Sequence, residues 1–219
     1  MARYSLFPGL LVLISCGQQK PPDASPAEPL HRAVTAPANK PDARPVIVAF
    51  GDSLTAGFGV NAGFSYPDFL QKQIDDYRVV NAGISGDTTS GGLSRIDTVI
   101  RLAPKIVILE LGGNDGLRGL PLASTRANLE QMIVELRKSG ARVVLAGITL
   151  PPNYGPDYIR DFEKIYKDLA AKYKLPFIPF LLQGVVGVPG MMQPDGIHAT
   201  VKGNEVVAGL VMRTLKPLL

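Results

Sequence analysis

Runs of consecutive apolar residues alternate with stretches of helical periodicity from residue 45 to residue 219. Short runs rich in Val and Ile are typical of strands that are buried on both faces of a sheet. Such runs predict strands over residues 46–50, 78–81, 106–111, 142–147 and 177–180. Amphipathic stretches between and after them predict helices over residues 66–75, 91–102, 123–138, 156–173 and 201–215.

The helical periodicity is clearest over residues 123–138. Its apolar face, spaced i, i+3, i+4 and i+7, is formed by Leu129, Met132, Ile133 and Leu136. Gly140 follows at the place where a C-terminal cap is expected. Strands that alternate with helices through short connections indicate right-handed crossovers and a parallel sheet covered on both faces. We therefore predict an α/β fold, in which ligands bind beyond the carboxyl ends of the strands.

Residues 1–44 differ from the rest of the chain. The apolar run over residues 4–15 is shorter than the roughly 20 residues that span a bilayer, but it is typical of a signal-peptide core. It ends on Ser15 and on Cys16, the only cysteine in the chain. A small residue directly before a lone cysteine resembles the bacterial lipoprotein processing site, where the thiol is lipidated. We therefore predict a signal peptide over residues 1–16 with lipidation at Cys16; the alternative is an ordinary secretory signal with an incidental cysteine.

The stretch from residue 17 to residue 44 is rich in Pro and Ala and has no apolar periodicity, which predicts an extended tether. We assign no role to His31 within it. The folded domain is expected over residues 45–219. The anchor predicts a location in the bacterial cell envelope, facing the periplasm. Gly17 stands where an aspartate would indicate the inner membrane, so we expect the outer membrane.

Composition narrows the classes of function. The chain has 23 basic and 19 acidic side chains and no run of Lys or Arg, so we expect no nucleic-acid partner. The predicted domain has one histidine and no cysteine, and we therefore expect no metal and no cofactor. At 219 residues and 46% hydrophobic, the chain is long enough for one domain with a real core. We expect a monomer.

Candidate chemistry lies at the predicted strand ends. Gly51-Asp52-Ser53-Leu54 follows the first strand, where glycine would permit a sharp exit and Asp52 would accept backbone N–H groups. Ser53 is either a nucleophile, which needs a base and oxyanion donors, or a helix N-cap. The candidate base is His198 in "QPDGIHAT", and Asp195 three residues earlier can hold its imidazole in the required tautomer.

Two further segments carry candidate oxyanion donors. Gly86 in "NAGISGDTTSGG" follows the second strand and can turn its N–H toward a ligand. Asn114 in "ELGGNDGLRG" follows the third strand and offers an amide. On composition alone, each segment is also compatible with a plain Gly/Asn/Asp turn. Neither matches a phosphate-binding glycine loop.

Taken together in this order, the four blocks resemble the SGNH, or GDSL-type, hydrolase family from about residue 46 to the end. The resemblance implies a flavodoxin-like three-layer sandwich with a five-stranded parallel sheet of order 2-1-3-4-5. It also implies a catalytic triad and an oxyanion hole. The triad would be Ser53, His198 and Asp195, and the hole would be the Ser53 and Gly86 N–H groups with the Asn114 side chain.

A closer likeness, carried especially by "TLPPNYGPDY", is to the bacterial periplasmic branch of this family with acyl-CoA thioesterase, arylesterase and lysophospholipase activities. In that branch the loop matching residues 149–154 borders the acyl site, and here a Pro-Pro pair departs from the pattern. The implied substrate-binding residues are Asp52, Leu54, Leu150 and Tyr154. Phe58, Met191 and Met192 are further apolar candidates, although apolar residues of this kind, Leu150 and Tyr154 included, more often belong to the core than to a pocket.

The expected function is serine-dependent hydrolysis of a small-molecule acyl ester or thioester through an acyl-enzyme. An alternative is a carbohydrate O-acetylesterase acting on cell-envelope or plant polysaccharide. An apolar groove longer than two carbons would distinguish the two. A second alternative is a tethered binding lipoprotein without catalysis, which the complete set of site residues argues against.

Overall fold

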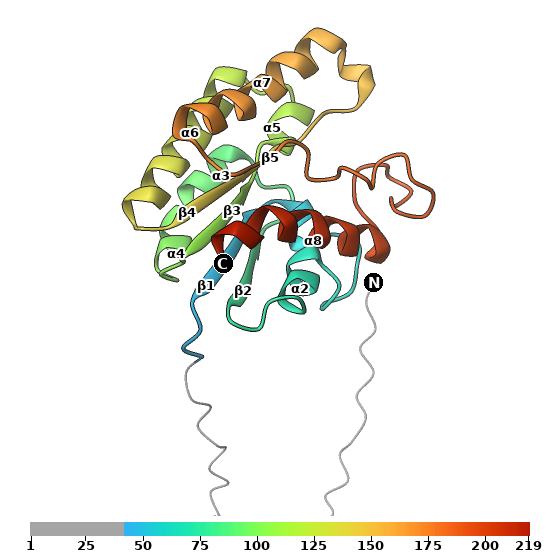
Figure 1. Ribbon diagram of the computed structural model, residues 1–219. Helices are drawn as coiled ribbons and strands as arrows, with labels where there is room; N and C mark the ends of the chain where they lie inside the picture. Colours follow the sequence, from blue (N-terminus) through green and yellow to red (C-terminus); the bar gives the residue numbers. More distant parts are fainter. Residues whose placement is uncertain (1–41) are drawn as a thin grey trace, which may run out of the picture. The chain divides into compact units, whose positions relative to one another are not determined.

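The computed structural model describes residues 42–219, which form a five-stranded parallel sheet between two layers of helices (Figure 1). The strands are β1 (Val46–Gly51), β2 (Arg78–Gly83), β3 (Ile106–Glu110), β4 (Arg142–Ala146) and β5 (Phe177–Ile178). Their order in the sheet is β2-β1-β3-β4-β5 and all pairs are parallel. The predicted flavodoxin-like α/β architecture and strand order are confirmed.

The helices are α1 (Ser53–Ala56), α2 (Tyr66–Gln71), α3 (Thr89–Ser94), α4 (Ile96–Ile100), α5 (Gly113–Leu117), α6 (Leu122–Lys138), α7 (Pro156–Tyr173) and α8 (Val201–Leu215). Two short 3-10 helices, η1 (Pro152–Tyr154) and η2 (Lys216–Leu218), complete the structure. The three long helices α6, α7 and α8 agree with the sequence prediction to within one residue at each end. Gly140 has φ +91° and follows the end of α6, as expected of a cap.

Three sequence predictions need correction. The helix expected over residues 91–102 is two helices, α3 and α4, divided at Arg95, whose guanidinium reaches back to the ends of β1 and β2. The helix expected over 66–75 ends at Gln71, where its side-chain amide donates to the Ile74 and Tyr77 carbonyls instead. The last strand has two residues rather than four, because Pro179 has no N–H to continue the ladder. Helices α1 and α5 were not predicted.

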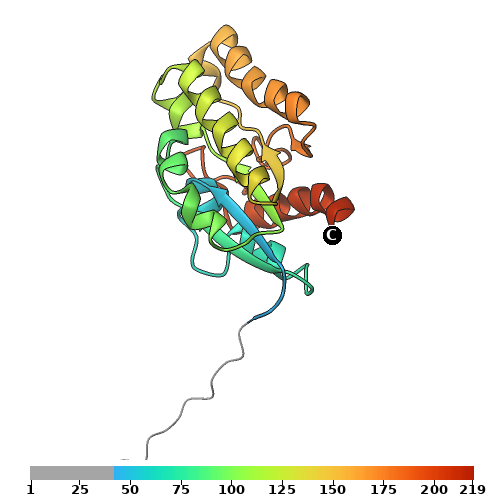
Figure 2. The same cartoon turned by 90° about the vertical axis from the view of Figure 1, so that its left-hand side faces the viewer.

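The core lies on both faces of the sheet. Alternate residues of the strands pack against α4, α6 and α7 on one face and against α2 and α8 on the other, an arrangement visible in Figures 1 and 2. Helices α1 and α5 begin directly beyond β1 and β3. They therefore place Ser53 and Asn114 at the carboxyl edge of the sheet.

The signal peptide predicted over residues 1–16, the lipidation site Cys16 and the tether up to residue 41 lie outside the described residues. Within residues 42–219, no helix is long and apolar enough to cross a membrane.

Candidate active site

Ser53 is the first residue of α1, immediately after β1. The N-cap of this helix is Asp52, whose Oδ1 accepts the Leu54 N–H at 3.0 Å. Ser53 is therefore not the cap, and its hydroxyl is free for another partner. The expectation that Asp52 fixes the turn by accepting a backbone N–H is met.

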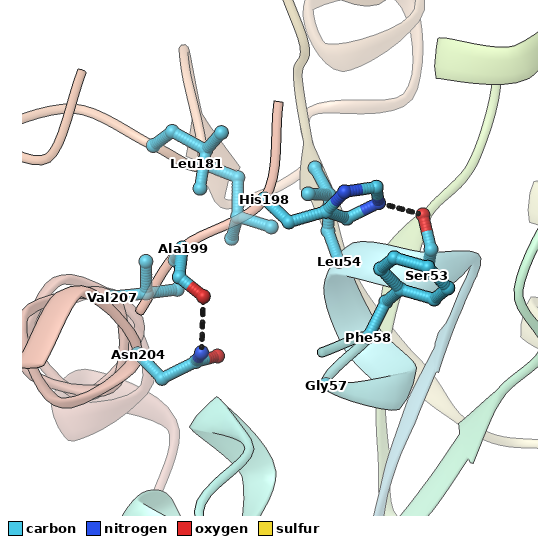
Figure 3. Close-up of a pocket in the computed structure, with 10 residues that line it drawn as sticks. Ser53, Leu54, Gly57, Phe58, Leu181, His198, Ala199, Asn204 and Val207 are labelled. Atoms are coloured by element: carbon cyan, nitrogen blue, oxygen red, sulfur yellow. Dashed lines mark hydrogen bonds between the residues drawn. The ribbon is translucent and has the colours of Figure 1, made fainter. Parts of the chain in front are cut away.

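The hydroxyl of Ser53 meets His198 (Figure 3). The distance between Ser53 Oγ and His198 Nε2 is 2.8 Å. On the other side of the ring, His198 Nδ1 lies 2.7 Å from Asp195 Oδ2. The loop before α8 thus delivers acid and imidazole on one turn, 145 residues along the chain from the serine.

Asp195 is held in the ionised form. Its Oδ1 accepts the N–H groups of Ile197 and His198 at 2.9 and 3.0 Å. Partial burial alone would raise the pKa of this carboxyl. The hydrogen bonds from the His198 backbone and ring and from the Ile197 backbone outweigh burial and lower the pKa to about 2. A carboxylate beside Nδ1 favours the tautomer that leaves Nε2 free to accept the serine proton.

The loop that carries His198 is held against the turn that carries Ser53 by two contacts that sequence reasoning did not find. The Gln193 amide donates to the Phe58 carbonyl at 2.7 Å and to the Ala199 carbonyl at 2.9 Å. The Phe58 ring lies 4.5 Å, centroid to centroid, from the imidazole (Figure 3). Phe58 was a candidate for the acyl site, but its ring contacts the His198 imidazole. Nothing in the local pattern of Gln193 distinguishes it from a surface residue.

The three oxyanion candidates are not equally free. Gly86 has φ +80°, and neither its N–H nor that of Ser53 has a hydrogen-bond partner within residues 42–219. By contrast, Asn114 Nδ2 donates to Asp52 Oδ2 at 3.0 Å and to the Asp87 carbonyl at 2.9 Å. The Asn114 amide would therefore have to share a hydrogen with a substrate oxyanion.

Asp52 is almost fully buried behind the serine. Burial raises the pKa of its carboxyl to about 6, although the Leu54 N–H, the His198 charge and the Asn114 amide act in the opposite direction. The charge of this group therefore changes within the range of pH in which an esterase is assayed.

An apolar cleft of about 630 Å³ opens beside Ser53 and His198. Its size is in the range of small-molecule sites. Its walls come from α5, α7 and the loops after β4 and β5, and include Leu117, Ile148, Leu150, Ile159, Phe180 and Leu182. Of the predicted substrate-binding residues, Asp52, Leu54 and Leu150 line it.

Tyr154 does not line the cleft. Its hydroxyl donates to the Leu117 carbonyl at 2.8 Å, and its ring stacks near Tyr158. The loop over residues 149–154 is thereby held at one end. At the other end, Thr149 Oγ1 donates to Glu163 at 2.7 Å. Met191 and Met192 also lie elsewhere, packed against the core layer that contains α8.

The parallel sheet and the Ser–His–Asp arrangement at its carboxyl edge define the class of the protein as a serine hydrolase with an α/β fold. The profile of the GDSL-like lipase/acylhydrolase family matches residues 49–206, well over half of the chain. The chain belongs to this family.

Comparison with individual proteins supports membership of this family. The chain is 47% identical over 178 residues to esterase TesA of Pseudomonas aeruginosa, covering 79% of this chain and 89% of the relative. It is 38% identical over 174 residues to thioesterase 1/protease 1/lysophospholipase L1 of Escherichia coli, covering 78% and 84%. The crystal structure of TesA matches with a TM-score of 0.76 at 46% identity, covering 80% of this chain and 99% of that one.

Proposed function

We propose that this protein hydrolyses carboxylic esters or thioesters of medium-length acyl chains through an acyl-enzyme on Ser53. The observation that carries the proposal is the Ser53–His198–Asp195 hydrogen-bond series opening directly onto the apolar cleft. The chemistry uses these three side chains, the oxyanion donors of the protein and water.

In the first half-reaction His198 Nε2 takes the proton of Ser53 as Oγ bonds to the substrate carbonyl carbon. The carbonyl oxygen becomes an oxyanion, and we assign its stabilisation to the N–H groups of Ser53 and Gly86, with Asn114 as the third donor. The carbon–oxygen or carbon–sulfur bond to the leaving group then breaks, and His198 returns the proton to the departing atom. Water repeats the sequence on the acyl-enzyme and releases the acid.

The cleft favours an acyl ester over an O-acetyl sugar as substrate. An acetyl group would leave most of a cleft of about 630 Å³ unfilled, and the walls of this cleft are mainly apolar. Sugar recognition would call instead for several polar side chains around the serine, whereas most side chains of these walls are apolar. The relatives named as esterase and thioesterase/lysophospholipase are consistent with the same class of substrate.

A series of p-nitrophenyl esters from acetate to decanoate tests this proposal. Each buried methylene contributes at most about 0.8 kcal/mol, roughly a fourfold gain in kcat/KM. We expect kcat/KM to rise over several carbons and then level off where the cleft ends. Ile159→Trp, which narrows the cleft, should shift the optimum to shorter chains. Ile100→Trp, at a half-buried isoleucine of α4 outside the cleft, should leave the optimum unchanged. Highest activity on acetate in the wild type would contradict the proposal.

We also propose that the protein is anchored in the bacterial envelope through Cys16 and faces the periplasm. The support is the sequence alone: the short apolar run, Ser15 before the only cysteine, and the Pro/Ala-rich segment that follows. Hydrolysis at a membrane surface would suit an apolar acyl substrate.

A further inference from the structure

The last residue of β3 is a glutamate with no exposed surface. Glu110 ends a strand that is otherwise Ile, Val and Leu, and its relative exposure is 0%. Burial of a carboxyl group is costly unless its oxygens are hydrogen-bonded. The register of the sheet places Glu110 directly beside Gly51, two residues before the nucleophile. A buried acid at this place needs an explanation that the proposed chemistry does not give.

One oxygen of Glu110 joins the two sides of the nucleophile turn. Its Oε2 accepts the Asp52 N–H at 3.3 Å and the Thr55 hydroxyl at 2.8 Å. Asp52 precedes Ser53 and Thr55 follows it by two residues, so the carboxyl group bridges the backbone that presents the serine.

The chain makes room for this carboxyl group. A side chain at Gly51 would collide with Glu110 Oε2 and with the Thr55 hydroxyl. Gly51 is not among the glycines with positive φ. The glycine of the Gly-Asp-Ser-Leu segment is therefore required for space rather than for a sharp exit from the strand, which corrects the sequence interpretation.

The surroundings of the bridging carboxyl group favour its neutral form. Burial raises the pKa of the Glu110 carboxyl well above its ordinary value, and the nearby Asp52 carboxylate raises it further. Two buried carboxyl groups so close together do not both ionise readily, and Glu110 is the more deeply buried of the two. Its Oε1 has no hydrogen-bond partner within residues 42–219. The contacts of Glu110 to the turn are accepted hydrogen bonds, a role that the amide oxygen of glutamine can also fill.

We propose that Glu110 is a positioning residue for catalysis, which holds the Asp52–Thr55 turn so that Ser53 Oγ stays within hydrogen-bonding distance of His198. This inference rests on the proposed role of Ser53 as nucleophile. Glu110 does not touch the substrate; it acts through the Asp52 N–H and the Thr55 hydroxyl.

The test compares three changes in the full-length protein. Glu110→Met keeps the approximate volume and removes the acceptor. Glu110→Gln keeps a neutral acceptor. Thr55→Val removes one of the two donors. We expect Glu110→Met to lower kcat on p-nitrophenyl butyrate and the rate of fluorophosphonate labelling by about 10–100-fold, with KM changed less than threefold, since small misplacements of reacting groups cost about this much. Glu110→Gln should recover most of the loss, and Thr55→Val should show a smaller loss of the same kind.

Leu169→Ala is the control for general destabilisation, because Leu169 is fully buried on α7 away from the turn. It should lower the melting temperature and leave kcat unchanged below the transition. Wild-type kcat in Glu110→Met, or equal losses in Glu110→Gln and Glu110→Met, would overturn the inference. If Glu110→Met does not fold, wild-type kcat in Thr55→Val would overturn it. Mass spectrometry of the labelled wild type distinguishes failure of this inference from failure of the proposed function. A label on a residue other than Ser53 would reject Ser53 as the nucleophile.

Discussion

The replacement Asp195→Asn isolates the charge behind His198. The asparagine Oδ1 can still accept the Ile197 and His198 N–H groups, so the loop should keep its shape. Its amide nitrogen would then occupy the place of Oδ2, 2.7 Å from His198 Nδ1. An amide donor at this position favours the tautomer with the proton on Nε2, which cannot accept the Ser53 proton.

The geometry also sets the size of the lost charge interaction. At the 2.7 Å separation of Nδ1 and Oδ2, the attraction between imidazolium and carboxylate is about 6 kcal/mol at an effective dielectric constant of ~20 and about 1.5 kcal/mol at ~80. The Asp195 side chain is 37% exposed, so solvent screening brings the value below the upper figure. An intermediate value of about 3–5 kcal/mol corresponds to a loss of roughly 10²–10⁴ in kcat. The comparable change in a serine protease triad lowers kcat about 10⁴-fold.

The assay is kcat/KM on one p-nitrophenyl ester across pH, for the wild type, Asp195→Asn and Asp157→Asn. Asp157 is an exposed acid on α7 and controls for loss of one negative charge. Wild-type activity should fall toward acid pH, because His198 must be neutral to take the proton. Asp195→Asn should lose 10²–10⁴ of the activity while Asp157→Asn loses none. Activity of Asp195→Asn within threefold of the wild type, or a wild-type profile with no decline toward acid, would refute the roles given to Asp195 and His198.

Three further outcomes are expected. Asn114→Ala should lower kcat by about 10²–10³ if the amide serves the oxyanion; a change confined to KM would show that Asn114 only positions substrate. Cys16→Ser should abolish lipid labelling and release the protein from the membrane fraction, whereas wild type recovered as a soluble species cleaved elsewhere would reject the anchor. Because the pKa of Asp52 is raised to about 6 when folded, the folded state loses stability as pH rises from the unfolded value of 3.8 through about 6. In Asp52→Asn the melting temperature should change less with pH over this range than it does in the wild type. Equal slopes of melting temperature against pH in the two proteins would contradict this expectation.

The local pattern of residues determined most of the fold. The runs of Val and Ile in β1, β3 and β4 indicate strands buried on both faces, because a strand with one face in solvent alternates apolar and polar residues. The helices α6, α7 and α8 were predicted from their helical periodicity, because each buries one face. The four sequence blocks also identified Ser53 and His198 as candidate site residues.

Tertiary structure decided what depends on contacts between distant segments. The break between α3 and α4 at Arg95 coincides with hydrogen bonds from its guanidinium to the Gly51 and Ala82 carbonyls, and no local pattern announces those partners. The cleft likewise depends on tertiary structure, because its walls come from five separate segments of the chain. So does the position of Tyr154 outside the cleft.

Glu110 is the clearest case of a residue whose role depends on tertiary structure. The sequence places this one acid near the end of an apolar run, and nothing in the local pattern assigns it a role. Only the parallel register of β1 and β3 places its carboxyl group beside Gly51 and beneath the serine turn, 58 and 55 residues from the Asp52 and Thr55 groups that it holds. Hydrogen bonds between segments so far apart depend on the folded arrangement of the backbone, and local propensity carries no information about it.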